Sequence, residues 1–304
     1  MIYHLTDGMF VVKQDNELAY LFRIGTREFY KMNRAAYNLI EKICLFEDIT
    51  ENNKFLNDLI RKNIIALGSC FKDDVISDLL NKLCGNPKLN GVYKNLLNIF
   101  SVRKIISREY YQLPALPSST LKRAKLIMNN KDIKKLVLLG DDDLTSIALL
   151  CLQKMGGRKI DMTVIDIDNY LLDFIKTIST FYLRLAPPET VNIDLRGELP
   201  SGFLGVYDAF ITDPEYTNFW FDVFISRGIS MIKEGGLGYF FGPRYAGYGP
   251  LLNNDIMKVL RKNSIKKYKI LKKFNRYFHP DVDRKGNLTL VSSDYQTDLW
   301  IIKK

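Results

Sequence analysis

The sequence has 304 residues, 47% of them hydrophobic and 12% aromatic, and a formal net charge of +10. This length and composition are enough for two folded domains and exclude a disordered chain. No apolar run approaches the ~20 residues of a membrane span, and the N-terminus lacks the basic-then-apolar order of a signal peptide. We therefore expect a cytoplasmic protein without a membrane partner.

Residues 1–68 are expected to form a small winged-helix-like α+β domain. Three alternating stretches predict short strands, at residues 9–14, 17–23 and 28–32. Asn33 then has the side chain of a helix cap, and the apolar residues that follow it fall on one helical face. A second helix is predicted over residues 53–62, and residues 64–67 close the unit. Residues 69–114 read as a mostly helical bridge, with helix-spaced apolar residues in two stretches.

The pattern changes in the third segment, residues 115–304. A helix capped by Ser118 or Ser119 comes first, and strand and helix signals then alternate. Strands are predicted at residues 134–140, 161–168, 191–195, 207–213 and 236–242. Because these strands are apolar without alternation, they should be buried on both faces of a parallel sheet. The fold class is therefore α/β, with a class I methyltransferase-like Rossmann domain after the small α+β domain.

Acidic residues follow four of these predicted strands. They are Asp141, Asp142 and Asp143 after the first, Asp166 and Asp168 at the second, Asp194 at the third and Asp213 at the fourth. Since the carboxyl ends of parallel strands meet at one edge of the sheet, these carboxylates should converge there. That edge is the expected ligand site.

The turn at Gly140 indicates what kind of ligand binds. The glycine set of dinucleotide-binding turns is absent, and three aspartates would repel a phosphate but attract a sulfonium or ammonium cation. Asp166 has the place of a carboxylate that binds ribose hydroxyls. Asp194 could accept a hydrogen bond from an adenine amino group. Asp213, Glu215 and Tyr216 lie where an acceptor amine would meet the donor.

Other chemistries have less to work with. The sequence has four cysteines without a Cys-x-x-Cys pair and two histidines, so we expect no metal site. Acid–base chemistry must then come from carboxylates and tyrosines. Lys258–Arg276 contains basic residues and no acidic one. It is either a solvated surface or a docking face for an acidic peptide or nucleic acid.

Several strings carry a family resemblance: GDDDLTS at 140–146, VIDID at 164–168, IDLR at 193–196, FITDP at 210–214, RGI at 227–229 and GYF at 238–240. Over about residues 110–245 the sequence resembles the bis(aminopropyl)spermidine synthases, or branched-chain polyamine synthases. The resemblance implies a Rossmann fold, decarboxylated S-adenosylmethionine as donor and Asp141 as the catalytic carboxylate. It extends the donor site to Gln112, Gly140, Asp142, Asp143, Ile167 and Leu195. Whether the donor keeps its carboxylate, as in S-adenosylmethionine itself, stays open.

Two departures from that family concern the acceptor. The family's Asp-Pro-Pro after the fourth strand reads Asp213-Pro-Glu-Tyr here, and the C-terminal extension is short and basic. Residues 8–67 meanwhile resemble the PqqD-like elements that hold leader peptides in ribosomal peptide maturation, through Phe29-Tyr30, Asn33, Ala36, Ile40 and residues 56–67.

Four hypotheses for the function follow. The first is an alkyl, most simply aminopropyl, transferase that acts on a precursor peptide held by the N-terminal domain. The second is a polyamine aminopropyltransferase that makes branched polyamines from spermidine. The third, a nucleic-acid methyltransferase, is disfavoured by the missing glycine-rich turn, and the fourth, a non-catalytic binding module, by the acidic strand ends. A homodimer is compatible with the sequence.

Overall fold

The computed structural model describes residues 1–15, 17–26, 28–50, 54–68, 70–84, 91–243, 253–282 and 288–304. The chain divides into two compact units. The first contains Met1–Ser118 and Phe278–Ser292, and the second contains Ser119–Tyr277 and Ser293–Lys304. Each unit has its own sheet and its own core.

The first unit is built on a four-stranded sheet of order β4-β3-β2-β6. Its strands are β2 (Met9–Lys13), β3 (Ala19–Arg23), β4 (Phe29–Met32) and β6 (Ile105–Ser107). The first three are the predicted meander, and β6 joins it parallel to β2. The remaining strands, β1 (Tyr3–Leu5) and β5 (Ile65–Leu67), pair with each other. β6 lies within residues 69–114, for which the sequence predicts a mostly helical segment. A three-residue apolar strand has the same local pattern as a buried helix end.

The helices of the first unit follow their local sequence signals. They are α1 (Arg34–Cys44), α2 (Lys54–Arg61), α3 (Asp74–Cys84) and α4 (Gly91–Val102). The side chain of Asn33 accepts a hydrogen bond from the Ala36 N–H, which confirms the predicted cap of α1. The predicted helix at residues 53–62 is α2, and residue 53 lies outside the described residues.

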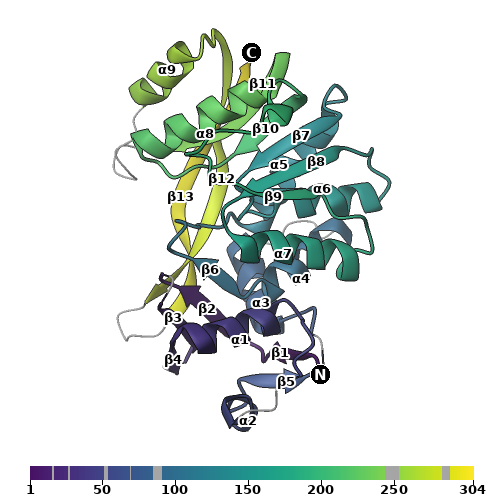
Figure 1. Ribbon diagram of the computed structural model, residues 1–304, viewed down its shortest axis with the longest axis vertical. Helices are drawn as coiled ribbons and strands as arrows, with labels where there is room; N and C mark the ends of the chain where they lie inside the picture. The colour runs from purple at the N-terminus through teal and green to yellow at the C-terminus, as the bar shows by residue number, and fades with distance from the viewer. Residues whose placement is uncertain are drawn as a thin grey trace. The chain divides into compact units, whose positions relative to one another are not determined.

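The second unit contains a seven-stranded sheet of order β12-β13-β11-β10-β7-β8-β9 (Figure 1). The strands of this sheet are β7 (Lys135–Leu139), β8 (Asp161–Asp166), β9 (Glu189–Asn192), β10 (Tyr207–Thr212), β11 (Ile232–Pro243), β12 (Lys267–Val282) and β13 (Leu288–Lys303). Residues 278–282 of β12 and 288–292 of β13 belong to the first unit. The five strands from β7 to β11 run parallel, and β13 pairs antiparallel with β11. This arrangement confirms the class I methyltransferase-like Rossmann fold.

Helices cover this sheet. They are α5 (Pro117–Asn129), α6 (Thr145–Lys154), α7 (Asn169–Thr177), α8 (Asn218–Met231) and α9 (Asn253–Lys262), with short helical turns at Ile178–Tyr182 and Ser201–Phe203. Since α5 begins at Pro117, Ser118 and Ser119 lie inside it and do not cap it; proline is favoured in a first helical turn because its missing N–H is not needed there. None of the described helices has the length and apolarity to cross a membrane.

The core of the second unit depends on close approach around Phe210 of β10. A Cβ added at Gly228 of α8 would lie 2.5 Å from the Phe210 ring, and one added at Gly238 of β11 would lie 2.4 Å from it. Both glycines therefore let α8 and β11 pack directly against this ring.

Candidate active site at the carboxyl edge of the sheet

The strand order defines a switch point between β7 and β10. From β7 the chain proceeds to β8 and β9 on one side, and then returns to β10 and β11 on the other side. Ligands of such sheets bind in the crevice outside the carboxyl ends at this point. The loop Asp141–Asp143 follows β7, and Asp213 follows β10, so both reach this crevice.

The turn after β7 buries Asp141. Gly140 has a φ of +72°, a conformation that favours glycine. The Asp141 carboxylate accepts hydrogen bonds from the Thr145 N–H at 2.7 Å and from the Ser146 hydroxyl at 2.5 Å, at the start of α6. Burial raises the pKa of Asp141 to about 7, against these hydrogen bonds, which lower it. A carboxyl with such a pKa can exchange a proton near neutrality. Asp142, next in the loop, is only partly buried.

Arg123 of α5 lies between two of the predicted carboxylates. Its guanidinium forms ion pairs with Asp143 and, at 2.5 Å, with Asp213, and both carboxylates and the arginine are almost fully buried. Its Nε donates to Asn275 at 3.1 Å, and its Cζ lies 3.9 Å from the centre of the Phe241 ring. Although burial opposes the charge, the two carboxylates raise the pKa of Arg123, so it stays a cation. Asp143 and Asp213 are thus joined by one internal cation.

Two tyrosines complete the set of hydrogen-bond donors around the Asp213 carboxylate. Tyr216 donates to one carboxylate oxygen at 2.8 Å and Tyr277 of β12 to the other at 2.7 Å. Burial raises the pKa of Tyr277 well above its ordinary value, and Thr297 of β13 lies 2.8 Å from its hydroxyl. Burial also raises the pKa of Asp213, against the effect of Arg123. This residue, expected to meet an acceptor amine, is therefore already fully hydrogen-bonded within the fold.

The end of β8 is more open. Asp166 is partly buried and accepts hydrogen bonds from the backbone N–H groups of Asp141, at 3.2 Å, and Asp168, at 2.9 Å. Asp168 caps α7 through the Tyr170 N–H. Ile167 is 38% exposed. Asp166 thus lies beside the Gly140 turn with its neighbour Ile167 facing solvent, an arrangement compatible with a ribose.

The loop after β9 carries Asp194. The strand ends at Asn192, earlier than predicted, so Asp194 belongs to the loop. Its carboxylate forms an ion pair with Arg196, which holds its pKa below the ordinary value, and Arg196 lies over the Trp220 ring. Arg227 of α8 donates to the carbonyl groups of the buried Leu195 and of Gly197, which ties the loop to α8.

The remaining predicted residues differ in their surroundings. Glu215 has a buried carboxylate oxygen that accepts no hydrogen bond from any described residue, and burial raises its pKa. Gln112 belongs to the first unit, where its side-chain oxygen accepts from the Ser107 N–H and from Arg103. Sequence reasoning missed Arg123, Asn275 and Tyr277. The available signal for Arg123 was its place on the buried face of the helix with Ala124 and Ile127, because a buried cation requires acidic partners.

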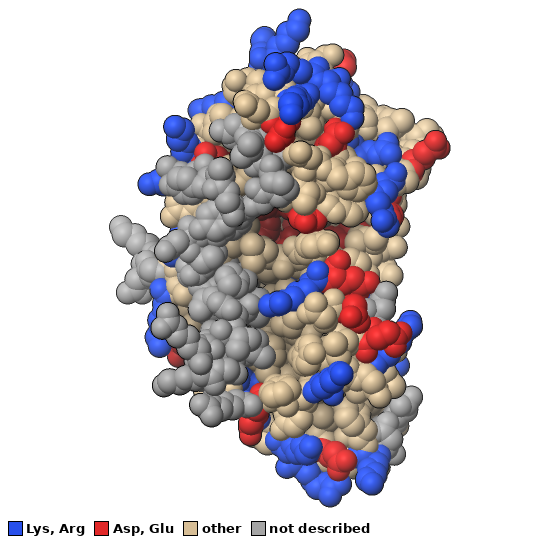
Figure 2. All heavy atoms as spheres, turned by 90° about the vertical axis from the view of Figure 1, so that its left-hand side faces the viewer, with Lys and Arg blue, Asp and Glu red and all other residues tan. Residues whose placement is uncertain are grey.

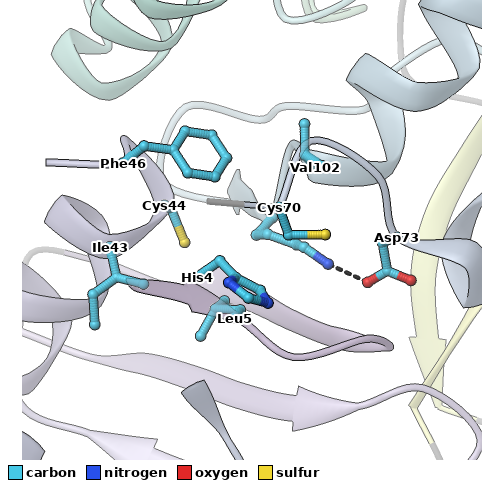
Figure 3. Close-up of a pocket in the computed structure, with 9 residues that line it drawn as sticks. His4, Leu5, Ile43, Cys44, Phe46, Cys70, Asp73 and Val102 are labelled. Atoms are coloured by element: carbon cyan, nitrogen blue, oxygen red, sulfur yellow. Dashed lines mark hydrogen bonds and ion pairs between the residues drawn. The ribbon is translucent and has the colours of Figure 1, made fainter. Parts of the chain in front are cut away.

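A pocket in the first unit is a weaker candidate (Figure 3). Its charged residues, Lys104 and Asp73, form a buried ion pair, and Asp73 also accepts from the Gly8 and Ile76 N–H groups. Burial raises the pKa of the Cys44 thiol to about 12, which keeps it protonated and unreactive. No cluster of His, Cys, Asp or Glu suited to a metal occurs among the described residues. We therefore interpret the Lys104–Asp73 ion pair that lines this pocket as structural.

The basic segment lies on α9 and β12. Lysine and arginine side chains gather at the upper end of Figure 2, where Figure 1 draws α9. Lys258 and Lys262 of α9 pair with Asp255 and Asp222. Because β12 is an edge strand of the sheet, its exposed lysines hinder the addition of another strand. This gives the segment a structural explanation that needs no nucleic acid.

Two curated enzymes are similar in sequence to part of this chain. The N(4)-bis(aminopropyl)spermidine synthase of Methanocaldococcus jannaschii is 36% identical over 171 residues, which are 53% of this chain and 47% of that protein. The enzyme of the same description from Thermococcus kodakarensis is 34% identical over 45% of this chain and 38% of its own length. The aligned regions thus span about half or less of these curated relatives.

A solved structure shows the same fold. The branched-chain polyamine synthase of Thermus thermophilus, in complex with N4-aminopropylspermidine and 5′-methylthioadenosine, superposes with a TM-score of 0.56 at 21% identity, covering 70% of this chain and 63% of that one. In addition, the family described as branched-chain polyamine synthase A C-terminal domain matches residues 91–292. These residues are more than half of the chain, and the chain therefore belongs to the branched-chain polyamine synthase A C-terminal domain family.

Proposed function

We propose that this protein is an aminopropyltransferase that moves an aminopropyl group from decarboxylated S-adenosylmethionine to an amine of a polyamine. The observation that carries the proposal is the buried Asp141 carboxyl at the switch point, beside Gly140 and Asp166. Membership of the polyamine synthase family supports it. The donor is given as decarboxylated because a donor carboxylate would need a cationic partner, and the side chains within 4 Å of a Cβ built at Gly140 are Phe224 and Asp166, neither of which is a cation.

The turn fits a nucleoside donor with a sulfonium. A Cβ added at Gly140 would lie 3.6 Å from the Phe224 ring and 4.0 Å from Asp166 Oδ2, so the glycine leaves this approach open. Asp166 would bind the ribose hydroxyls. Ile167, Asp194 and Leu195 would lie along the base, with Asp142 and Asp143 adding negative charge near the sulfonium. The donor, when bound, supplies the activated carbon and the leaving group.

The transfer needs only a neutral amine and a proton acceptor. The amine nitrogen attacks the carbon next to the sulfonium, a carbon–nitrogen bond forms, and the carbon–sulfur bond breaks with its electron pair passing to sulfur. The products are methylthioadenosine and an alkylated ammonium, which gives one proton to Asp141. Orientation of the two reactants and general-base catalysis account for the rate. Asp213 and Tyr216 shape the acceptor side of the crevice.

The acceptor is assigned as a polyamine and not as a precursor peptide. The relatives named above are bis(aminopropyl)spermidine synthases, which favours this reading over the peptide-directed one. The predicted meander and helix of the first unit do not discriminate between them, since many scaffolds share this arrangement. The leader-peptide hypothesis therefore has no support beyond the sequence resemblance of residues 8–67.

The test is a transfer assay with the full chain, spermidine and either decarboxylated or intact S-adenosylmethionine. We expect methylthioadenosine and an alkylated spermidine with the decarboxylated donor only. Asp141→Asn should lower kcat about 10²–10⁴-fold, the usual contribution of a general base. Transfer from intact S-adenosylmethionine, or an Asp141→Asn variant that is fully active, would contradict the proposal.

A further inference from the structure

The carboxylates at the switch point differ in how far internal bonds already occupy them. Asp213 receives hydrogen bonds from Arg123 and two tyrosines, and Asp143 pairs with the same arginine. Asp141 accepts from backbone and hydroxyl groups at the start of α6. These carboxylates are engaged by the fold itself before a substrate arrives.

Glu215 differs from these carboxylates. It lies three residues beyond the end of β10, where its backbone oxygen accepts from the Thr217 N–H as α8 begins. Its Oε2 atom is buried and accepts no hydrogen bond within the part of the chain that the structure describes. A buried acceptor without a partner costs roughly 1–3 kcal/mol, and such atoms in native proteins require an explanation. A partner outside the protein is a direct one.

We infer that Glu215 binds an ammonium group of the acceptor and so selects acceptors with a second, charged nitrogen. The inference rests on the proposed function and adds the recognition element. A polyamine carries several amines a few carbons apart, so one nitrogen can be neutral and attack while another stays protonated. An ammonium provides both the hydrogen-bond donor and the charge that Oε2 lacks.

The position of Glu215 supports binding over proton transfer. Its neighbour Tyr216 is held on Asp213, so the chain on both sides of Glu215 is fixed by the Arg123 network and by the start of α8. A carboxylate that follows β10 at the switch point, with one buried oxygen that has no hydrogen-bond partner among the described residues, is suited to set the distance between the bound ammonium and the attacking nitrogen. Glu215 would thereby select acceptors by the distance between their two nitrogens and by the charge of the second one.

The experiment is calorimetric titration of spermidine into the full chain in the presence of methylthioadenosine. Glu215→Gln keeps the shape and removes the charge, Glu215→Asp keeps the charge, and Glu198→Gln is a matched control at an exposed glutamate of the same unit. We expect Glu215→Gln to raise the Kd for spermidine about 10–100-fold, the loss of one charged hydrogen bond. Glu215→Asp should lie between this variant and the unsubstituted protein, and Glu198→Gln should bind as the unsubstituted protein does.

A second measurement compares the affinity of the protein for two acceptors. The unsubstituted protein should bind spermidine much more tightly than dipropylamine, a secondary amine without a second nitrogen, and Glu215→Gln should lose about the same factor of 10–100 in this preference. The melting temperature of Glu215→Gln should not fall, because the substitution removes the charge of a carboxylate whose buried Oε2 atom has no hydrogen-bond partner among the described residues.

Three outcomes would overturn the inference: an unchanged Kd for spermidine in Glu215→Gln, a loss of kcat at unchanged spermidine affinity, or lost binding accompanied by a fall in melting temperature. The first denies the contact, the second makes Glu215 a proton acceptor, and the third makes it structural. Absence of transfer by the unsubstituted protein, with spermidine binding that still depends on Glu215, would instead contradict the proposed function and leave the inference standing.

Discussion

The carboxyl edge of the sheet has two halves, and both carry aspartates. The aspartates of the two halves differ in burial and in their ion-pair partners. In the inner half, after β7 and β10, Asp143 and Asp213 are buried and share Arg123. In the outer half, after β8 and β9, Asp166 is partly buried and Asp194 pairs with Arg196 at the surface. Burial therefore separates the two halves: the inner aspartates share an internal cation, whereas the outer ones keep contact with solvent.

The largest expected effect comes from removing the shared cation. Arg123→Met would leave Asp143 and Asp213 buried without a counter-ion, and breaking a buried ion pair costs about 3–5 kcal/mol. Denaturant unfolding, followed by circular dichroism, would measure the loss. The triple variant that also carries Asp143→Asn and Asp213→Asn should regain part of it. If Arg123→Met alone were as stable as the unsubstituted protein, the inner aspartates would not depend on a buried cation, and the two halves would not differ in this respect.

The next effect concerns the pH dependence of the inner half. Burial raises the pKa of Asp141 from 3.8 to about 7. The folded state therefore binds this proton more tightly than the unfolded state, and the contribution to stability is complete below pH ~4 and is lost as the pH rises towards ~7. The free energy of unfolding of Asp141→Asn, relative to the unsubstituted protein, should thus increase over this range. A constant difference from pH 4.5 to 7.5 would contradict the assignment.

A smaller effect is expected for the outer carboxylate that we place on the donor. Asp166→Asn should weaken binding of decarboxylated S-adenosylmethionine about tenfold, the loss of a charged hydrogen bond to ribose. Calorimetric titration measures it, with Glu198→Gln as the matched exposed control. The stability of the variant should change much less than that of Arg123→Met. Unchanged donor affinity would mean that the donor does not contact Asp166 at the end of β8.

The smallest effect is expected for the surface pair. Arg196→Met removes the partner of Asp194, but exposed ion pairs contribute little because water and salt screen them. Its unfolding midpoint should match that of the unsubstituted protein, in contrast to Arg123→Met. A marked loss of stability would show that the outer loop is as firmly bound as the inner half, and the comparison between them would fail.

Much of the fold could be predicted from the sequence because the signals are local. Apolar strands without alternation indicated a parallel sheet buried on both faces, and Asn33 marked the start of α1. The acidic residues after the strands were visible for the same reason, since a strand end and the residue that follows it are neighbours in the chain. The end of β9 was predicted less well from the sequence. The predicted strand includes Asp194, whereas in the structure β9 ends at Asn192 and Asp194 lies in the loop that follows.

The pairings at the site depended on tertiary structure. Arg123 lies 20 residues from Asp143 and 90 from Asp213, and no local pattern specifies that one guanidinium binds both. The hydroxyl of Tyr277, on a strand 64 residues beyond Asp213, completes the set of hydrogen-bond donors around that carboxylate. The sequence by itself determined which residues reach the carboxyl edge, because that follows from strand order along the chain. Only the tertiary structure decided which of them are already paired and which, like Glu215, have a buried oxygen without a hydrogen-bond partner among the described residues, because burial and long-range contacts exist only in the folded protein.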